Sequence, residues 1–190
     1  MFDDLIRKRR SIRRFRDQPV EPEKVDKLLE AGLRAPSSRS LNPWEFVVVD
    51  DRPLLEKLAG CKPHGAGFLA QAPLGIVVCA DPARCDVWVE DCAIAVTFIQ
   101  LMAVALDLGS CWIQVRKRTH ASGCPARDDI ARHLDLPDRL AVEAMIAIGY
   151  PIEPKTGHAR ETLLFERVHR NGFATPYRFR MVRYRALAPR

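Results

Sequence analysis

The sequence predicts an α+β chain in which helices and strands share one hydrophobic core. Four short apolar runs have the composition of buried strands, and the segments between them carry apolar residues at helical spacing. The chain has 190 residues, of which 47% are hydrophobic. That length suits one domain with a sizeable core, and no repeat or linker divides it.

The first 60 residues predict two helices, a loop, a strand and a third helix. Asp3 or Asp4 can cap a short helix at the N-terminus. A second helix starts at Pro22, because proline is tolerated in a first turn, and it ends before Pro36. There follow a polar loop over 36–43, a strand over 45–49 whose three valines suit a sheet buried on both faces, and a helix over 53–59.

The remaining residues predict three strands and two helices. The strands are 74–80, 110–115 and 142–148, and a helix over 126–134 precedes the last of them. The other helix, 87–108, is apolar nearly all round and stops at Gly109. Such a helix needs cover on every side, so it either fills the centre of the domain or contributes to a subunit interface.

The apolar content does not predict a membrane protein. The most apolar stretch, 92–106, is interrupted by Thr97 and Gln100 and is short for a bilayer span. No secretory hydrophobic region follows Met1, because charges begin at Asp3. We therefore expect a soluble, cytoplasmic protein.

The six cysteines predict neither a zinc site nor disulfides. They form no CxxC pair, and a structural zinc site needs clustered thiolates at short spacing. Cys79, Cys92 and Cys111 lie inside apolar runs, where a free cysteine behaves as a small hydrophobe. Buried reduced thiols fit a cytoplasmic protein.

The net charge of +6 is concentrated at the two ends of the chain. Residues 1–16 carry seven Lys or Arg against two Asp, and residues 167–190 carry seven Arg and no acid. The middle of the chain carries sixteen bases and twenty-two acids. An acidic body does not favour a protein whose whole surface binds nucleic acid.

Motifs for protein-based catalysis are missing from the sequence. It contains no GxSxG, HExxH, Walker or GxGxxG motif, and its five histidines have no metal-ligand spacing. If the protein is an enzyme, a cofactor supplies the chemistry. Residues 9–15, RRSIRRF, suit a phosphorylated cofactor, because arginine binds phosphate through paired charged hydrogen bonds. A solvated basic face or a nucleic-acid contact remains open for the same residues.

Six stretches in order resemble the FMN-dependent nitroreductase family and together cover about residues 5–170. They are RRSIRRF, APSSRSLNPWEFVVV, FLAQAPLGIVVCAD, DCAIAVTFIQLMAVALDLGSCWI, LDLPDRLAVEAMIAIGYP and RETLLFERVH. The resemblance implies a mixed, mostly antiparallel central sheet flanked by helices, in an intertwined homodimer. It also implies an FMN-binding domain over 1–170, with 171–190 as its basic C-terminal extension.

The resemblance assigns the cofactor contacts to particular residues. Arg9 and Ser11 would hold the FMN phosphate, with Arg10 along the ribityl chain and Arg13 near N1 and O2 of the flavin. Arg160 would be a second phosphate ligand. The loop residues Pro36, Ser37, Ser38, Arg39 and Ser40 would approach the flavin from the partner subunit, and Gln114 and Arg116 would lie near N5 and O4. Ser40 and Asn42 depart from the asparagine and glutamine common in the family.

The implied activity is NAD(P)H-dependent reduction of nitroaromatics, quinones or similar acceptors through FMN, in a ping-pong sequence with no catalytic residue from the protein. Basic residues after 115 could favour an anionic donor or acceptor. The arginine-rich tail is expected to wrap an acidic partner subunit. The alternatives are a flavin-binding protein without turnover and a basic-tailed nucleic-acid binder.

Overall fold

The computed structural model describes residues 1–153 and 155–179. The chain divides into two compact units, Met1–Gly157 and His158–Arg190, and each is described by itself. The prediction that residues 1–170 form one domain stays a prediction. The predicted role of the basic tail falls partly on residues 180–190, which lie outside the described residues.

Every helix and strand predicted from the sequence is present in the first unit. In chain order the elements are α1 (Phe2–Lys8), α2 (Pro22–Leu33), β1 (Trp44–Val49), α3 (Arg52–Ala59), β2 (Leu74–Ala80), α4 (Trp88–Ala105), β3 (Gly109–Gln114), α5 (Ala126–His133) and β4 (Ala141–Gly149). Short 3₁₀ turns occur at η1 (Ser38–Ser40) and η2 (Gly67–Gln71), and in the second unit at η3 (Arg160–Thr162) and η4 (Phe165–Arg167).

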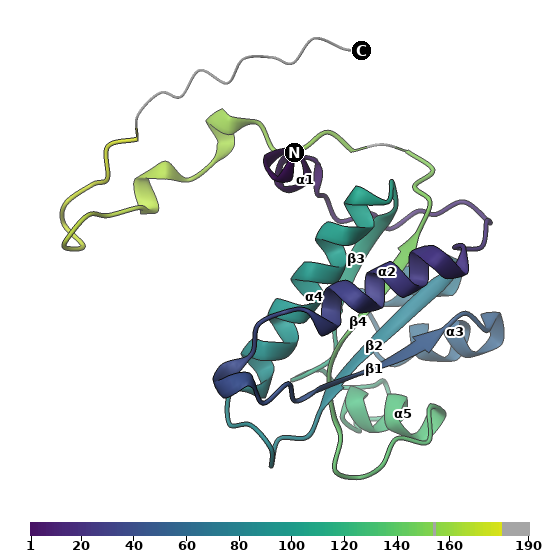
Figure 1. The fold of residues 1–190 in the computed structure, drawn as a ribbon. Coiled ribbons are helices and arrows are strands. Elements are labelled where there is room, and N and C mark those ends of the chain that lie inside the picture. The colour runs from purple at the N-terminus through teal and green to yellow at the C-terminus, as the bar shows by residue number, and fades with distance from the viewer. Residues whose placement is uncertain (154, 180–190) are drawn as a thin grey trace. The chain divides into compact units, whose positions relative to one another are not determined.

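The four strands form one sheet in the order β1-β2-β4-β3, and all three pairings are antiparallel. Helices α2 and α4 cover one face of this sheet, and α3 and α5 cover the other (Figure 1). A single parallel bridge joins Ser11 to Ser110 beside β3. The α+β class and the mostly antiparallel sheet are therefore confirmed.

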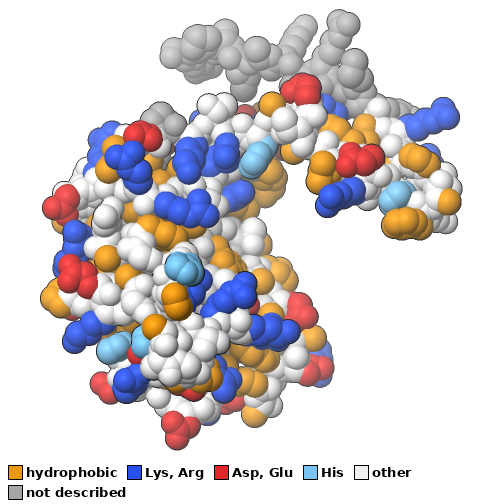
Figure 2. Space-filling view, turned by 180° about the vertical axis from the view of Figure 1, so that it is seen from behind, with side chains coloured by type: hydrophobic (Ala, Val, Ile, Leu, Met, Phe, Trp, Pro, Cys, Tyr) orange, Lys and Arg blue, Asp and Glu red, His pale blue; other side chains and the backbone are white. Residues whose placement is uncertain are grey.

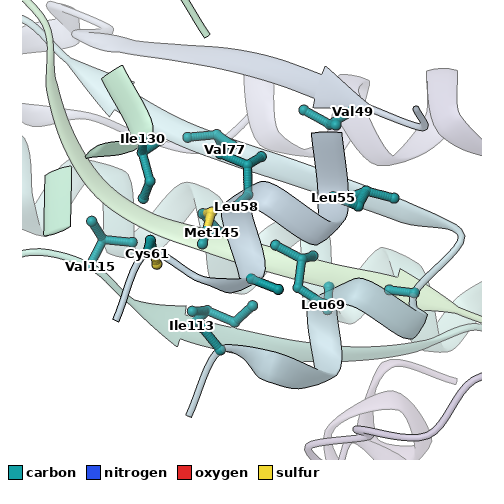
Figure 3. Packing of buried hydrophobic residues seen from close by; sticks show 14 of the residues in the cluster. Val49, Leu55, Leu58, Cys61, Leu69, Val77, Ile113, Val115, Ile130 and Met145 are labelled. Carbon is teal, nitrogen blue, oxygen red and sulfur yellow. The ribbon is translucent and has the colours of Figure 1, made fainter. Parts of the chain in front are cut away.

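The core lies on both sides of β2 and β4, whose residues are all buried. On the α3 side, Leu55 and Leu58 pack against Val77, Met145 and neighbouring apolar side chains (Figure 3). Burying each such side chain contributes about 1.5–3 kcal/mol. Continuous apolar runs predicted these two strands because neither face of them meets water.

Two local predictions in the N-terminal part are wrong. Within the described part of the chain, β1 is an outer strand of the sheet, and its valines are not buried on both faces, since Val48 is 38% exposed. The cap of α1 is Met1, not Asp3 or Asp4, and neither acid accepts a capping hydrogen bond. Asp4 instead pairs with the N-terminal amine at 3.1 Å.

Helix α4 is covered on one side only. Its buried face includes Cys92, Val96 and Ile99, which pack on the sheet. Ile94 and Phe98 on the opposite face are 37% and 39% exposed. By length and composition α4 could cross a membrane, but a core helix meets the same criterion, and the buried Asp91 lies on its inner face. The exposed apolar stripe agrees with the interface alternative predicted for this helix.

All six cysteines are free thiols in the structure. Five are buried, and only Cys124 is partly exposed. Burial raises the pKa of Cys61 to about 11 and that of Cys79 to about 12. The described residues contain no cluster of side chains that could hold a metal ion.

Candidate functional site

The N-terminal arginine segment runs beside β3 and is held there by backbone hydrogen bonds. The Ile12 amide donates to the Ser110 carbonyl at 3.0 Å, and the Arg16 amide donates to the Tyr150 carbonyl at 2.8 Å. The side chain of Ile12 is buried over Gly109, where an added Cβ would lie 2.8 Å from it. The two residues flanking Ile12, Ser11 and Arg13, are thereby fixed along the edge of β3.

The charges of three basic side chains act on the buried thiol of Cys111, the third residue of β3. Burial raises the pKa of Cys111, while the charges of Arg13, Lys155 and Arg9 and a hydrogen bond with Ser11 act in the opposite direction. Lys155 also donates to the Ser11 carbonyl at 3.2 Å. Arg9, Ser11 and Arg13, predicted from the sequence as cofactor ligands, therefore lie together.

A further base reaches β3 from the loop after α3. The Lys62 ammonium donates to the Gln114 carbonyl at 2.7 Å. Burial lowers the pKa of Lys62, and the charge of Arg118 lowers it further. The guanidinium of Arg13 lies 5.7 Å from the centre of the Phe68 ring in η2. The bases near β3 thus come from segments far apart in sequence.

We call Arg9, Arg13, Lys62, Arg118 and Lys155 the β3 basic cluster. Among the described residues, none of the five forms an ion pair with a carboxylate within 4 Å. Figure 2, which views the face opposite α2 and α4, shows Lys and Arg side chains gathered over the first unit. Uncompensated positive charge at this density favours an anionic ligand.

Sequence reasoning missed three of the residues at this position. Lys62 and Phe68 lie in the loop and 3₁₀ turn between α3 and β2, and Lys155 follows β4. Neither lysine belongs to a local basic motif. Only the fold brings them to β3, so no pattern in the sequence identifies them.

The side chain of Arg10 has a different hydrogen-bond partner from those described for Arg9 and Ser11. Its guanidinium donates to the Thr156 carbonyl. It lines a pocket of about 260 Å³ together with Lys8 and Lys155, next to the end of α4. Its predicted contact with a cofactor stays a prediction.

Gln114 and Arg116 lie at the other end of β3, beside a buried carboxyl group. Gln114 accepts from the Trp112 indole at 2.9 Å and donates to the Arg116 carbonyl at 3.0 Å. Glu143 is 3% exposed and lies at an irregularity in the pairing of β2 with β4. Its Oε2 has no hydrogen-bond partner and is 3.8 Å from Nε of Arg116. Burial raises the pKa of Glu143, and Arg116 opposes this rise.

The loop over 36–43 is fixed at the N-terminal end of α4. The Ser38 amide donates to the buried Asp91 carboxylate at 2.9 Å, and Arg39 pairs with Asp86. Ser37 Oγ accepts from the Asn42 amide at 3.0 Å. Arg39, Ser40 and Asn42 all adopt positive φ, between 45° and 53°, which costs energy in residues with a Cβ. Pro36 and Ser40 are exposed.

Within one chain this loop does not meet the arginine segment. The loop contacts the first turn of α4, whereas Ile12 packs on Gly109 beyond its last turn (Figure 1). The 18 residues of α4 separate the two by about 27 Å. The two groups of predicted ligands could share one cofactor only if two chains contributed them.

The last predicted ligand, Arg160, lies in the second unit. Its guanidinium stacks on the Phe165 ring at 4.8 Å, and Phe165 contacts Phe179 with ring centres 4.7 Å apart. Tyr177 completes this aromatic group at 4.8 Å from Phe179. The predicted phosphate contact of Arg160 stays a prediction.

Comparison with known proteins gives consistent matches. Residues 6–62 and 60–150 match the nitroreductase family. An FMN-dependent nitroreductase from Clostridium difficile R20291 has a similar structure, with a TM-score of 0.87 and 47% identity over 89% of this chain and 98% of that one. A relative from Archaeoglobus fulgidus, provisionally named NADH dehydrogenase/NAD(P)H nitroreductase, is 34% identical over 87% of this chain and 95% of its own length. A provisionally named nitroreductase from Desulfovibrio desulfuricans, solved in complex with FMN, has a TM-score of 0.69 and 32% identity over 86% of this chain and 95% of that one.

Proposed function

The chain belongs to the nitroreductase family, and on that basis we propose that it is an NAD(P)H-dependent oxidoreductase that holds FMN along β3. The observation that carries this proposal is the β3 basic cluster. Its charges lie beside an edge strand with no carboxylate paired to them among the described residues. A flavin mononucleotide is an anion of the kind that such a cluster would bind.

The donor groups fit this cofactor in their chemical type. Arg9 and Ser11 offer guanidinium and hydroxyl donors for a phosphate at the start of β3. Arg13 and Lys62 offer fixed positive charge further along the strand, where a reduced flavin carries negative charge. Gln114 ends the strand with a side-chain amide that is already oriented by Trp112 and Arg116.

FMN, when bound, would supply two-electron transfer from NAD(P)H to an electron-poor acceptor such as a nitroaromatic or a quinone. The donor and the acceptor use the same position in turn, which is a ping-pong sequence. The protein side chains bind and orient, and none of them transfers a proton in this proposal. Arg13 stabilises the reduced state because a guanidinium keeps its charge at all accessible pH values.

We propose that the active form is a homodimer located in the cytoplasm. The exposed stripe of Ile94 and Phe98 on α4 supports an interface on that face. A second chain would bring its loop of Pro36, Ser37, Ser38, Arg39 and Ser40 to the cofactor. The separation of about 27 Å within one chain supports this arrangement.

The first test is the visible spectrum of the purified protein, followed by titration with FMN. We expect bound flavin and steady oxidation of NADH or NADPH in the presence of menadione or nitrofurazone. An Arg9→Ala/Ser11→Ala variant should bind FMN at least tenfold more weakly, whereas Arg14→Ala, which removes an exposed partner of Glu153, should not. A colourless protein that does not bind FMN would contradict the proposal, and flavin without turnover would favour the binding-protein alternative. Nucleic-acid binding without flavin would favour the other alternative.

A further inference from the structure

A basic pocket lies just beyond the end of β3. It shares Arg118 with the β3 basic cluster, and its other lining residues are not members of that cluster. It has a volume of about 470 Å³. Its lining is Trp88, Val115, Arg116, Lys117, Arg118, Thr119, Gly123, Pro125, Arg127, Ala141 and Val142. Four of these residues are bases and none is an acid. The pocket therefore concentrates positive charge in a concave surface with apolar walls.

The turn that forms the pocket has a fixed conformation. The Arg118 amide donates to the Val115 carbonyl at 3.0 Å, and the Ala126 amide donates to the Arg118 carbonyl at 2.9 Å. Lys117 has a φ of 58°, a conformation that disfavours residues with a Cβ. The hydrogen bonds hold this residue in place, so the bases are presented from an ordered backbone.

Two of the four bases in the pocket lack a carboxylate partner among the described residues. Arg127 pairs with the exposed Asp128 at 3.2 Å. Among the described residues, Lys117 and Arg118 form no ion pair within 4 Å. Arg116 pairs with the buried Glu143 at 3.8 Å, and Glu143 is not part of the lining.

The pocket adjoins the position proposed for the flavin. Gln114 is the last residue of β3 and donates through its side chain to the carbonyl of Arg116, which lines the pocket. Lys62 donates a hydrogen bond to the Gln114 carbonyl, and the charge of Arg118 lowers the pKa of Lys62. A ligand with one end at the flavin could thus place its other end among these bases.

We propose that this pocket binds the adenosine 2′-phosphate part of NADPH and makes NADPH the preferred electron donor. This inference rests on the proposed function. A phosphate monoester is a dianion that arginine binds through paired hydrogen bonds, and Lys117 and Arg118 offer two positive charges that no carboxylate pairs with among the described residues. The volume exceeds that of a phosphate ion alone, and the half-buried Trp88 offers a flat aromatic surface for the adenine ring.

The direct test is calorimetric binding of adenosine 2′,5′-bisphosphate, compared with adenosine 5′-monophosphate, to the full chain carrying its flavin. We expect the bisphosphate to bind at least tenfold more tightly, and a Lys117→Ala/Arg127→Ala variant to lose most of that difference. Lys27→Ala/Arg34→Ala is the matched control, because it removes the same two charge types from exposed positions on α2. It should keep the full difference.

Three results would overturn the inference. These are equal affinity for the two nucleotides, an unchanged preference in the Lys117/Arg127 variant, and displacement of the bisphosphate by inorganic phosphate at the same concentration. The kinetic counterpart is kcat/KM with NADPH and with NADH. Equal values in the wild-type enzyme would refute the donor preference while leaving the oxidoreductase function intact. If neither NADPH nor NADH is oxidised, the proposed oxidoreductase function is refuted. The calorimetric comparison of the two nucleotides would then still test whether the pocket binds the 2′-phosphate.

Discussion

Replacing Gly109 with alanine tests whether the close contact between β3 and the arginine segment positions the cofactor ligands. A Cβ at residue 109 would lie 2.8 Å from Cβ and Cγ2 of Ile12 and 2.9 Å from its Cγ1. The Cβ of Ile12 is bonded to the backbone, so no change of side-chain rotamer relieves this contact. The segment that carries Ser11 and Arg13 must therefore move away from β3.

The expected loss of stability is modest. Overpacking of a core contact costs about 1–3 kcal/mol, and the reduced freedom of alanine in the unfolded chain returns about 0.4–1 kcal/mol. A net loss of about 1–2 kcal/mol corresponds to a decrease in Tm of roughly 2–8 °C for a chain of this size. Loss of one charge-assisted hydrogen bond to the cofactor would weaken FMN binding roughly tenfold to a hundredfold.

The assay combines thermal unfolding of the apoprotein with FMN titration followed by flavin fluorescence. Gly75→Ala is the matched control, because a Cβ there would lie 2.9 Å from Cδ2 of Leu55, inside the core and away from the arginine segment. It should lower Tm without a comparable loss of FMN affinity. The reasoning is refuted if Gly109→Ala lowers Tm but keeps wild-type FMN affinity, or if Gly75→Ala weakens FMN binding equally.

Three further predictions concern single side chains. Burial raises the folded-state pKa of Glu143 above its ordinary value of 4.5, so ionisation costs stability as the pH rises through that range. Glu143→Gln removes this cost of ionisation, so at pH 8 it should raise Tm by about 2–4 °C for each kcal/mol of stability regained. Below pH 4 it should have little effect, and an equal gain at both pH values would contradict this. Titration of the native protein with a disulfide reagent should show one fast thiol that Cys124→Ser removes, because the other five are buried, and survival of the fast phase would be inconsistent with the structure. Arg13→Ala should lower the flavin midpoint potential by about 30 mV for each 1.4 kcal/mol of lost stabilisation, with Arg14→Ala as the unaffected control, and an unchanged potential in Arg13→Ala would exclude that role.

The fold was largely predictable because, along most of the chain, the spacing of apolar residues in the sequence matches the burial of those residues in the structure. β2 and β4 are apolar at nearly every position, and both are central strands with no exposed face. β1 shows the limit of this reasoning. Its valine run resembles that of a central strand, but the strand order places it at an edge, and strand order depends on the whole topology.

The site was predictable only where its residues are contiguous. Arg9, Ser11 and Arg13 form a local motif, and the structure brings all three to Cys111. Lys62 and Lys155 join them through contacts between distant segments, which composition and spacing do not encode. Glu143 was missed for a related reason, because a glutamate within an apolar strand carries no sign of its orientation before the irregular β2–β4 pairing is known.

The kinds of residue at β3 explain why the sequence lacks motifs for acid–base catalysis. The side chains gathered there are guanidinium, ammonium, hydroxyl and amide groups, and the arginines keep their charge at every accessible pH. Such groups bind an anion and stabilise negative charge that develops on it, and the guanidinium groups among them do not exchange protons at neutral pH. The carboxyl of Glu143 is buried behind Arg116, where it can influence the orientation of that side chain. In the proposed function, such a site would leave electron transfer to the bound cofactor, and the protein would supply position and charge.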